Sequence, residues 1–117
     1  MKKEKKRIKI GAHWYKVSWN YKFTERFDIS GLSTHGIKEI YITDVDGNGR
    51  RYSESYIGTT FIHEIIHCVD EVYNGGKLDE ETVKRLGEGL CQVLNDNKLL
   101  KWFPLSKILK IAGWKKK

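Results

Sequence analysis

The sequence predicts an α+β fold in which a small antiparallel or mixed three-stranded sheet packs on two helices, with a short helix at the C-terminus. Short β-branched and aromatic runs separated by turn residues occupy positions 8–42, whereas apolar residues recur at helical spacing from about Ile57 onward. The chain has 117 residues, of which 39% are hydrophobic, enough for one modest core. We therefore expect a single domain over residues 1–117, with basic, flexible ends at 1–7 and 113–117.

Three strands are expected in the N-terminal third of the chain. Ile8 and Ile10 alternate with a lysine, and residues 14–19 are rich in aromatic and β-branched side chains, so these two runs predict a hairpin. Residues 20–36 are rich in turn formers and are expected to be a loop. The third strand is expected at residues 37–42.

A turn at residues 44–49 follows the third strand. Its pattern D-x-D-x-N-G matches the start of a calcium-binding loop, but the twelfth position holds Ser55 instead of a bidentate glutamate. We therefore interpret this segment as an ordinary turn.

Two longer helices and one short helix are expected after this turn. The first starts near Ile57 and stops at residues 74–76, with a core face of Ile62, Ile65, Ile66, Val69, Val72 and Tyr73. The second begins at Asp79 as N-cap and ends near residue 95, with a core stripe of Val83, Leu86, Leu90, Val93 and Leu94. A short, basic amphipathic helix is expected around residues 105–112. The two cysteines, Cys68 and Cys91, fall inside the longer helices and are expected to be free, buried thiols.

The net charge of +7 is concentrated at the two ends. Residues 1–9 carry +5 and residues 98–117 carry +7, whereas the body between them carries −5. Basic ends can contact nucleic acid or an anionic membrane, but nucleic-acid-binding domains carry their positive charge on the folded body, so solvated ends are the preferred interpretation. No apolar run has the length of a transmembrane segment and none follows the basic N-terminus as in a secretory signal, so we expect a cytoplasmic protein.

The pattern that carries chemistry is His63-Glu64-Ile65-Ile66-His67, an H-E-x-x-H motif inside the first predicted helix. Residues four apart lie on one side of a helix and one turn apart, so the two imidazoles can converge on a single Zn²⁺. Glu64 is offset by about 100° around the helix. It can therefore reach a water on the metal without binding the metal, and act as general base. The motif predicts a catalytic zinc site with His63 and His67 as ligands.

A catalytic zinc needs a third protein ligand, and no histidine follows His67. The downstream candidates are carboxylates. Asp70 lies one turn beyond His67 and suits a partner that orients a ligand better than a ligand itself. Asp79 and Glu80 are explained by N-capping and by the positive end of the helix dipole.

Glu88 is the favoured third ligand because of its neighbours. It lies between Gly87 and Gly89 inside a predicted helix, where two glycines cost about 2 kcal/mol relative to alanines. Bare backbone on both sides would let the second helix approach the first closely enough for Glu88 to reach the metal. The alternative is an ordinary exposed glutamate.

The two motif histidines and a glutamate on the following helix resemble the gluzincin branch of zinc metallopeptidases. In a chain this small, the arrangement is similar to the minimal gluzincins and to phage-encoded proteins of the same type. The resemblance implies a zinc-dependent endopeptidase in which His63, His67 and Glu88 bind one Zn²⁺ and Glu64 is the general base. It also implies that the sheet's edge strand, expected at Ile40, Tyr41 and Ile42, aligns an extended peptide substrate by β-augmentation.

Two further features of that family, a segment that covers the cleft and a residue that stabilises the oxyanion, have candidates in this chain. Minimal gluzincins are latent, with a C-terminal segment over the cleft, and the residues after Asn97 are candidates for such a segment. Larger gluzincins stabilise the oxyanion with a tyrosine or histidine from another subdomain, for which His35 and Tyr73 are the candidates here, with loop and core packing as the alternative roles.

Two other functions compete with proteolysis alone. The first is a zinc-bound regulatory or interaction module with little proteolytic activity. The second is proteolysis tethered to nucleic acid through the basic ends, as in SprT-like proteins. That family takes its third ligand from a downstream histidine, which is missing here, so nucleic acid is the less favoured partner.

Overall fold

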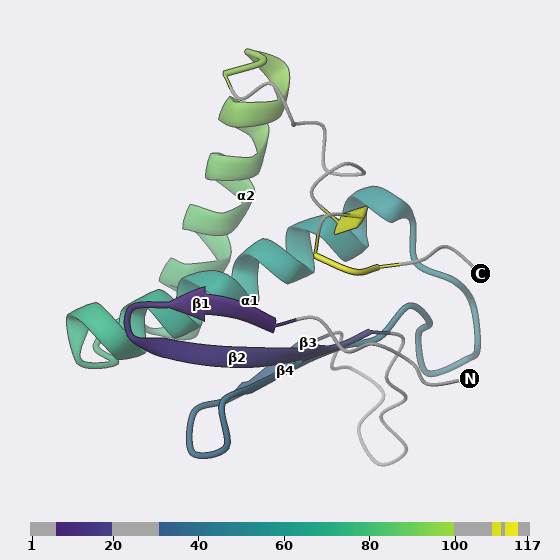
Figure 1. The fold of residues 1–117 in the computed structure, drawn as a ribbon. Coiled ribbons are helices and arrows are strands. Elements are labelled where there is room, and N and C mark those ends of the chain that lie inside the picture. Colours follow the sequence, from purple (N-terminus) through teal and green to yellow (C-terminus); the bar gives the residue numbers. More distant parts are fainter. Residues whose placement is uncertain (1–6, 20–30, 100–108, 111, 115–117) are drawn as a thin grey trace.

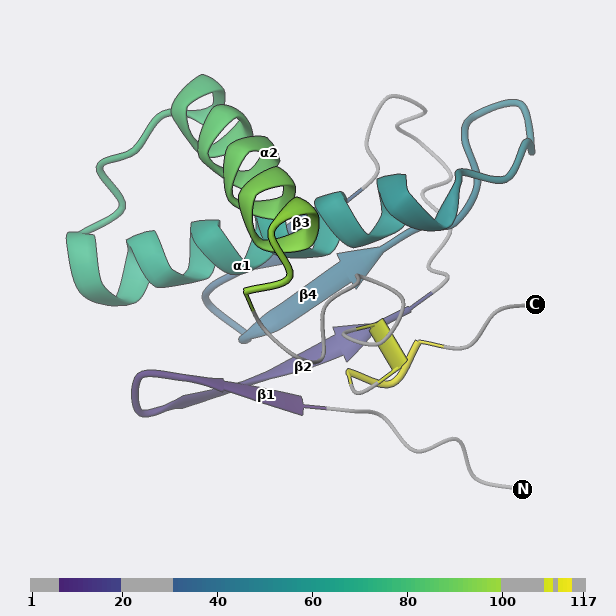
Figure 2. The ribbon, with the colours of Figure 1, turned by 90° about the horizontal axis from the view of Figure 1, so that it is seen from above.

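The computed structural model describes residues 7–19, 31–99, 109–110 and 112–114. The elements, in chain order, are β1 (Arg7–Ile10), β2 (His13–Ser18), β3 (Gly31–Thr34), β4 (Glu39–Ile42), α1 (Glu54–Asn74) and α2 (Glu80–Asp96). The fold is α+β, with a four-stranded mixed sheet and two helices. In Figures 1 and 2, α1 lies along one face of the sheet and α2 crosses over α1 on the side away from the sheet.

The sheet has the strand order β1-β2-β4-β3. The β1–β2 hairpin is antiparallel, β2 and β4 run parallel, and β4 pairs antiparallel with β3 from Glu39–Thr34 to Ile42–Gly31. The expectation of three strands is therefore wrong, because β3 lies in the segment predicted to be a loop. Its sequence Gly-Leu-Ser-Thr has a weak strand signal of its own, and the pairing with β4 holds it in the sheet.

The added strand changes which part of the sheet is an edge. β4 is paired on both sides, and its residues Ile40 and Ile42 are buried in the core. The expectation that residues 37–42 form the edge strand is wrong for this reason. On the side of the sheet beyond β4, the edge is β3.

The core lies between the sheet and α1. Tyr15 and Val17 of β2 pack with β4 and with three α1 residues, Ile57, Phe61 and Cys68. The described C-terminal residues add Leu109, Ala112 and Trp114 to this cluster, and the Trp19 indole N–H donates to the carbonyl oxygen of Ala112 at 3.0 Å.

The described residues at the chain ends belong to the folded domain: Arg7 lies in β1, and Trp114 is buried. The other residues of the ends expected to be flexible, 1–6 and 115–117, lie outside the described residues. The predicted helix at 105–112 falls largely on residues 105–108 and 111, which lie outside the described residues.

The ends of α1 follow local sequence signals. The Ser53 hydroxyl accepts the backbone N–H of Tyr56 at the N-terminus, and Gly75, with φ 69°, ends the helix in the left-handed conformation. The buried face differs in part from the predicted one, because the sheet covers the side that carries Phe61 and Cys68, while Ile65 and Val72 of the predicted face are partly buried against the core. Val69 and Tyr73, expected in the core, are exposed.

α2 begins as predicted but buries a narrow stripe. Asp79 Oδ1 accepts the backbone N–H of Thr82 at 2.8 Å. The α2 residues buried in the structure are Val83, Gly87 and Cys91. Most of the predicted core stripe is instead exposed: Leu86, Leu90 and Val93. Both cysteines are free and buried, as expected.

The segment after β4 is a turn, as the sequence indicates. Asp46 Oδ1 accepts the backbone N–H groups of Asn48 and Arg50, at 2.8 and 2.9 Å.

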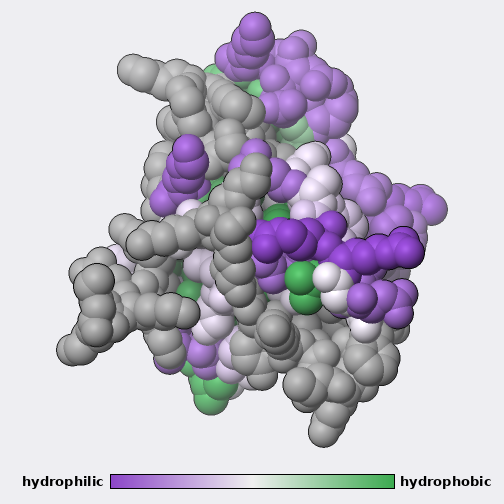
Figure 3. All heavy atoms as spheres, turned by 90° about the vertical axis from the view of Figure 1, so that its right-hand side faces the viewer, coloured by the Kyte–Doolittle hydropathy of each residue, from purple (hydrophilic) through white to green (hydrophobic). Residues whose placement is uncertain are grey.

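On the face of the molecule in Figure 3, the coloured surface is mostly hydrophilic, with hydrophobic residues in small, separate areas. Neither described helix is long and apolar enough to cross a membrane.

Candidate metal centre

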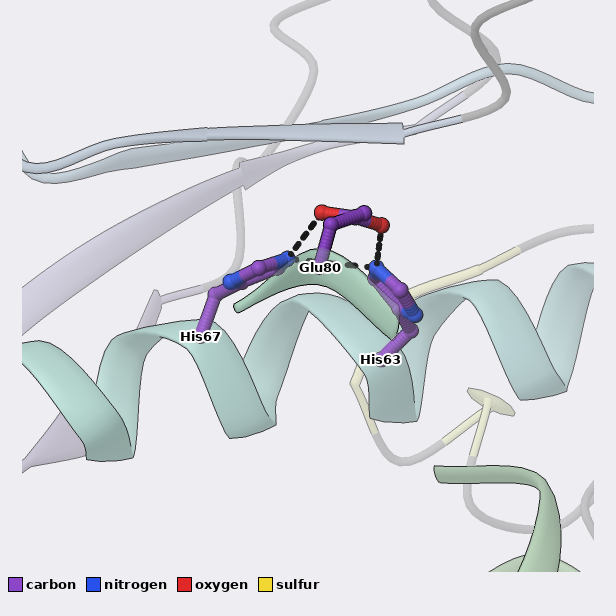
Figure 4. Close-up of side chains that lie close together, drawn as sticks. All are labelled: His63, His67 and Glu80. Atoms are coloured by element: carbon purple, nitrogen blue, oxygen red, sulfur yellow. Dashed lines mark hydrogen bonds and ion pairs between the residues drawn. The ribbon is translucent and has the colours of Figure 1, made fainter. Parts of the chain in front are cut away.

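Two histidines from α1 and one glutamate from α2 meet in a single cluster. His63 Nε2 lies 2.7 Å from Glu80 Oε2, and His67 Nε2 lies 2.9 Å from Glu80 Oε1. The two Nε2 atoms are 3.2 Å apart. Figure 4 shows the Glu80 carboxylate between the two imidazole rings, which rise from successive turns of α1.

This donor set suits zinc. Bonds of about 2.0–2.1 Å at tetrahedral angles place neighbouring ligand atoms about 3.3 Å apart. The possible ligand atoms of His63, His67 and Glu80 all lie within 4.8 Å of one another, so small side-chain rotations can open room for one ion. Two imidazoles and a carboxylate leave the fourth position open, which is typical of a catalytic rather than a structural zinc site.

Local structure explains how Glu80 reaches α1. Asp79 caps α2, which makes Glu80 the first residue of the helix. The preceding loop is tied to α1 by Asp70, whose carboxylate accepts the backbone N–H of Leu78, with distances of 3.3 and 3.2 Å to its two oxygens. The first turn of α2 is thereby held beside the histidines.

Asp70 makes its hydrogen bonds at the end of α1 and in the loop before α2. Its carboxylate is buried and also accepts a hydrogen bond from the Asn74 amide at 2.8 Å, so it contacts the end of the helix and the loop rather than a histidine. Among the described residues its hydrogen bonds go to Asn74 and Leu78, and its predicted role as a partner that orients a ligand stays a prediction. Asp70 contributes indirectly, by fixing the loop that positions Glu80.

Glu88 lines the same pocket but contacts a different residue. Its carboxylate lies 3.6 Å from Lys84 Nζ one turn earlier on α2, and its side chain is 55% exposed. Only one of its flanking glycines faces α1: a Cβ on Gly87 would lie 3.6 Å from His63 Cα, whereas a Cβ on Gly89 would meet open space. Among the described residues, the carboxylate that joins the two histidines is that of Glu80, and the role of Glu88 as a ligand stays a prediction.

Glu64 lies beside the cluster and is almost fully buried. Its Oε1 accepts the hydroxyl of Ser33 on β3 at 2.9 Å. Burial raises the pKa of the Glu64 carboxyl, and the Ser33 hydrogen bond and the two nearby histidines partly oppose this rise. The motif glutamate is thus held apart from the three candidate ligands.

These residues share one cavity of about 600 Å³. One wall is α1, with His63, Glu64 and His67, a second is α2, and a third is β3 with the following His35. His35 lines the cavity, and its Nδ1 lies 3.2 Å from the hydroxyl of the buried Tyr15.

Tyr73, the other oxyanion candidate, is far from this cavity. Its side chain is 71% exposed, and its ring lies beside Gly11 at the β1–β2 turn. The structure therefore leaves His35 as the oxyanion candidate of the two.

The residues predicted to bind substrate do not line the cavity. Ile40 and Ile42 belong to the core, and the Tyr41 hydroxyl donates to Glu39 Oε1 at 2.8 Å, which lowers the pKa of the Glu39 carboxyl. The strand that lines the cavity is β3, through Gly31, Leu32 and Ser33.

The sequence analysis explained Glu80 by its place in the first turn of α2 and did not consider Ser33, although both residues line the cavity. The signal for Glu80 is the short connection between the helices, which keeps the first turn of α2 within reach of α1. Ser33 has no such signal, because its position depends on the pairing of β3 with β4.

Comparisons with known protein families, with curated proteins and with solved structures find no match to this chain.

Proposed function

We propose that the protein is a zinc-dependent peptidase of the gluzincin type, which hydrolyses peptide bonds in extended segments of protein. The observation that carries this proposal is the meeting of His63, His67 and Glu80 beside the buried carboxylate of Glu64, in one cavity. An isolated pair of helical histidines would not require a carboxylate from a second helix or an acid held next to it.

In this proposal His63, His67 and Glu80 hold the ion. Zinc, when bound, supplies Lewis acidity that lowers the pKa of a water molecule to about 7. The histidines are only 17% and 23% exposed, so their ring nitrogens are oriented by α1 and the overlying α2. The Glu80 side chain is 71% exposed, so its carboxylate has room to rotate as it completes the ligand set.

Glu64 moves the proton. Its carboxylate accepts a proton from the attacking water, and the water oxygen forms the new bond to the carbonyl carbon of the substrate. The same carboxyl then delivers that proton to the amide nitrogen as the C–N bond breaks. A raised pKa suits a group that must both accept and release a proton near neutral pH.

The edge strand β3 is the proposed binding site for the peptide backbone. β3 pairs with β4 on one side, and no described strand pairs with its other side. Its residues line the cavity, so an extended peptide added to this edge would run beside the histidines. This assignment replaces the predicted one at β4, which has no free edge.

The test measures metal content and cleavage together. We expect one zinc per chain and cleavage of a denatured, fluorescently labelled protein, and we expect Glu64→Gln to abolish cleavage while retaining the zinc. Zinc binding without cleavage of any denatured substrate would contradict the peptidase and favour the regulatory or interaction module. The full chain is the right material, because removal of residues 98–117 to relieve latency would also remove the buried residues Leu109, Ala112 and Trp114.

A further inference from the structure

The position of Glu64 depends on a strand outside the motif. Ser33 of β3 lies opposite Ile40 of β4 in the sheet register, and its hydroxyl donates to Glu64 Oε1 at 2.9 Å. Within the part of the chain that the structure describes, no hydrogen bond is made to Oε2, the other carboxylate oxygen. Ser33 thus holds one oxygen of the motif glutamate, and the other makes no hydrogen bond to a described residue.

Gly31, two residues before Ser33, makes this contact possible. A Cβ on Gly31 would lie 2.7 Å from Thr60 Cγ2 and 3.1 Å from both Cγ and Oε2 of Glu64. The first distance is shorter than real Cβ contacts, and Thr60 is buried, so β3 could not approach α1 this closely with a larger residue at position 31. The bare Cα also leaves space around Oε2 at the wall of the cavity.

We infer that Ser33 is a positioning residue for Glu64, and that Gly31 provides the close approach of β3 to α1 that this role requires. The inference rests on the proposed function, since it assigns Glu64 as the general base. A carboxylate free to rotate would present either oxygen in many orientations. Ser33 fixes Oε1 and so holds the Glu64 carboxylate in one orientation at the wall of the cavity, which is the pre-organisation that a general base needs.

The first test is a double-mutant cycle on stability, which needs no catalysis and no metal. Urea unfolding of the metal-free full-length protein is compared with that of Ser33→Ala, Glu64→Ala and the double variant. We expect the two changes to be coupled by on the order of tenfold in the unfolding equilibrium constant. Strictly additive effects would overturn the contact, whether or not the protein is an enzyme.

The second test separates positioning from binding. We expect Ser33→Ala to lower kcat by about tenfold or more, with KM and zinc content close to those of the wild type. Ser33→Thr, which keeps the hydroxyl, should restore most of the lost rate. Thr34→Ala is the matched control, because it removes a hydroxyl from the neighbouring β3 residue, which is not part of the cavity wall.

The outcomes distinguish the two proposals. An unchanged kcat in Ser33→Ala, in a protein whose Glu64→Gln variant is inactive, would overturn the positioning role and leave the peptidase intact. Absence of cleavage by the wild type would overturn the peptidase and the catalytic meaning of the contact, while the cycle would still report the contact itself. Gly31→Ala gives an independent variant, with an expected loss of kcat although every hydrogen-bonding group is retained.

Discussion

At the scale of single residues, the choice between Glu80 and Glu88 decides how the metal is bound. Glu80 lies within 2.9 Å of both histidine nitrogens, whereas the Glu88 carboxylate lies beside Lys84. The sequence favoured Glu88, because capping and the helix dipole already explained an acidic residue at position 80. A residue can serve both purposes, and a local explanation for it does not exclude a contact across the fold.

The two glutamates make distinct predictions. We expect Glu80→Gln to weaken zinc binding by about 100-fold or more. Loss of a residue that only hydrogen-bonds a metal ligand typically costs 10- to 100-fold, and loss of a ligand itself should cost more. Glu88→Gln should change zinc affinity by less than about threefold, because it removes only an exposed ion pair with Lys84. Competition with a chromophoric chelator measures both affinities. Zinc binding that survives in Glu80→Gln and is lost in Glu88→Gln would show that the metal draws Glu88 in and displaces Glu80.

At the scale of elements, the helices could be predicted and the complete sheet could not. α1 and α2 are long and periodic, and Ser53, Gly75 and Asp79 mark their ends through contacts within a few residues. β3 has four residues and depends on β4, so its signal is not in its own sequence. For the same reason Ser33 could not be assigned before the fold was known.

Which face of each helix is buried was also beyond the sequence. Both helices carry apolar residues over a wide arc, and the arc that becomes buried depends on where the sheet and the other helix lie. Phe61 and Cys68 of α1 face the sheet, while Leu86 and Leu90 of α2 are left exposed. The histidines lie between the two contact surfaces of α1, which is why they border a cavity.

The two glycines beside Glu88 give a test at this scale. Gly89 faces open space, so Gly89→Ala should raise the free energy of unfolding by up to about 1 kcal/mol through helix propensity. Gly87→Ala should also be tolerated, because its methyl group would make ordinary contacts of 3.6 Å with α1. Thermal and urea unfolding measure both effects.

A third glycine supplies the control for this pair. Gly75→Ala should lower stability by about 1 kcal/mol, since its φ of 69° disfavours any side chain. A large loss of stability in Gly89→Ala would instead support the idea that both glycines flanking Glu88 are needed for close helix packing.

At the scale of the whole molecule, α2 is the element most weakly attached to the rest. Among the described elements its main partner is α1, and the α2 residues buried there are Val83, Gly87 and Cys91. A small buried surface gives little hydrophobic stabilisation, so the position of α2 depends on additional links. The Asp70 contact with the loop is one such link, and zinc shared between α1 and Glu80 would be another.

This architecture predicts that metal binding stabilises the protein and does so mainly at α2. With free zinc at 100 times its Kd, linkage adds about 2.7 kcal/mol to the free energy of unfolding. For a domain of this size that gain corresponds to a rise in Tm of about 10 °C.

Chelation should reverse this rise in Tm, and hydrogen exchange should show increased protection in the first turns of α2 rather than in the sheet. Glu80→Gln should lose most of the rise in Tm, because a variant that binds zinc about 100-fold more weakly is only half occupied at this zinc concentration, and linkage then adds only about 0.4 kcal/mol. An equal rise in Glu80→Gln and the wild type, or protection confined to α1, would mean that the two histidines bind the ion without the second helix.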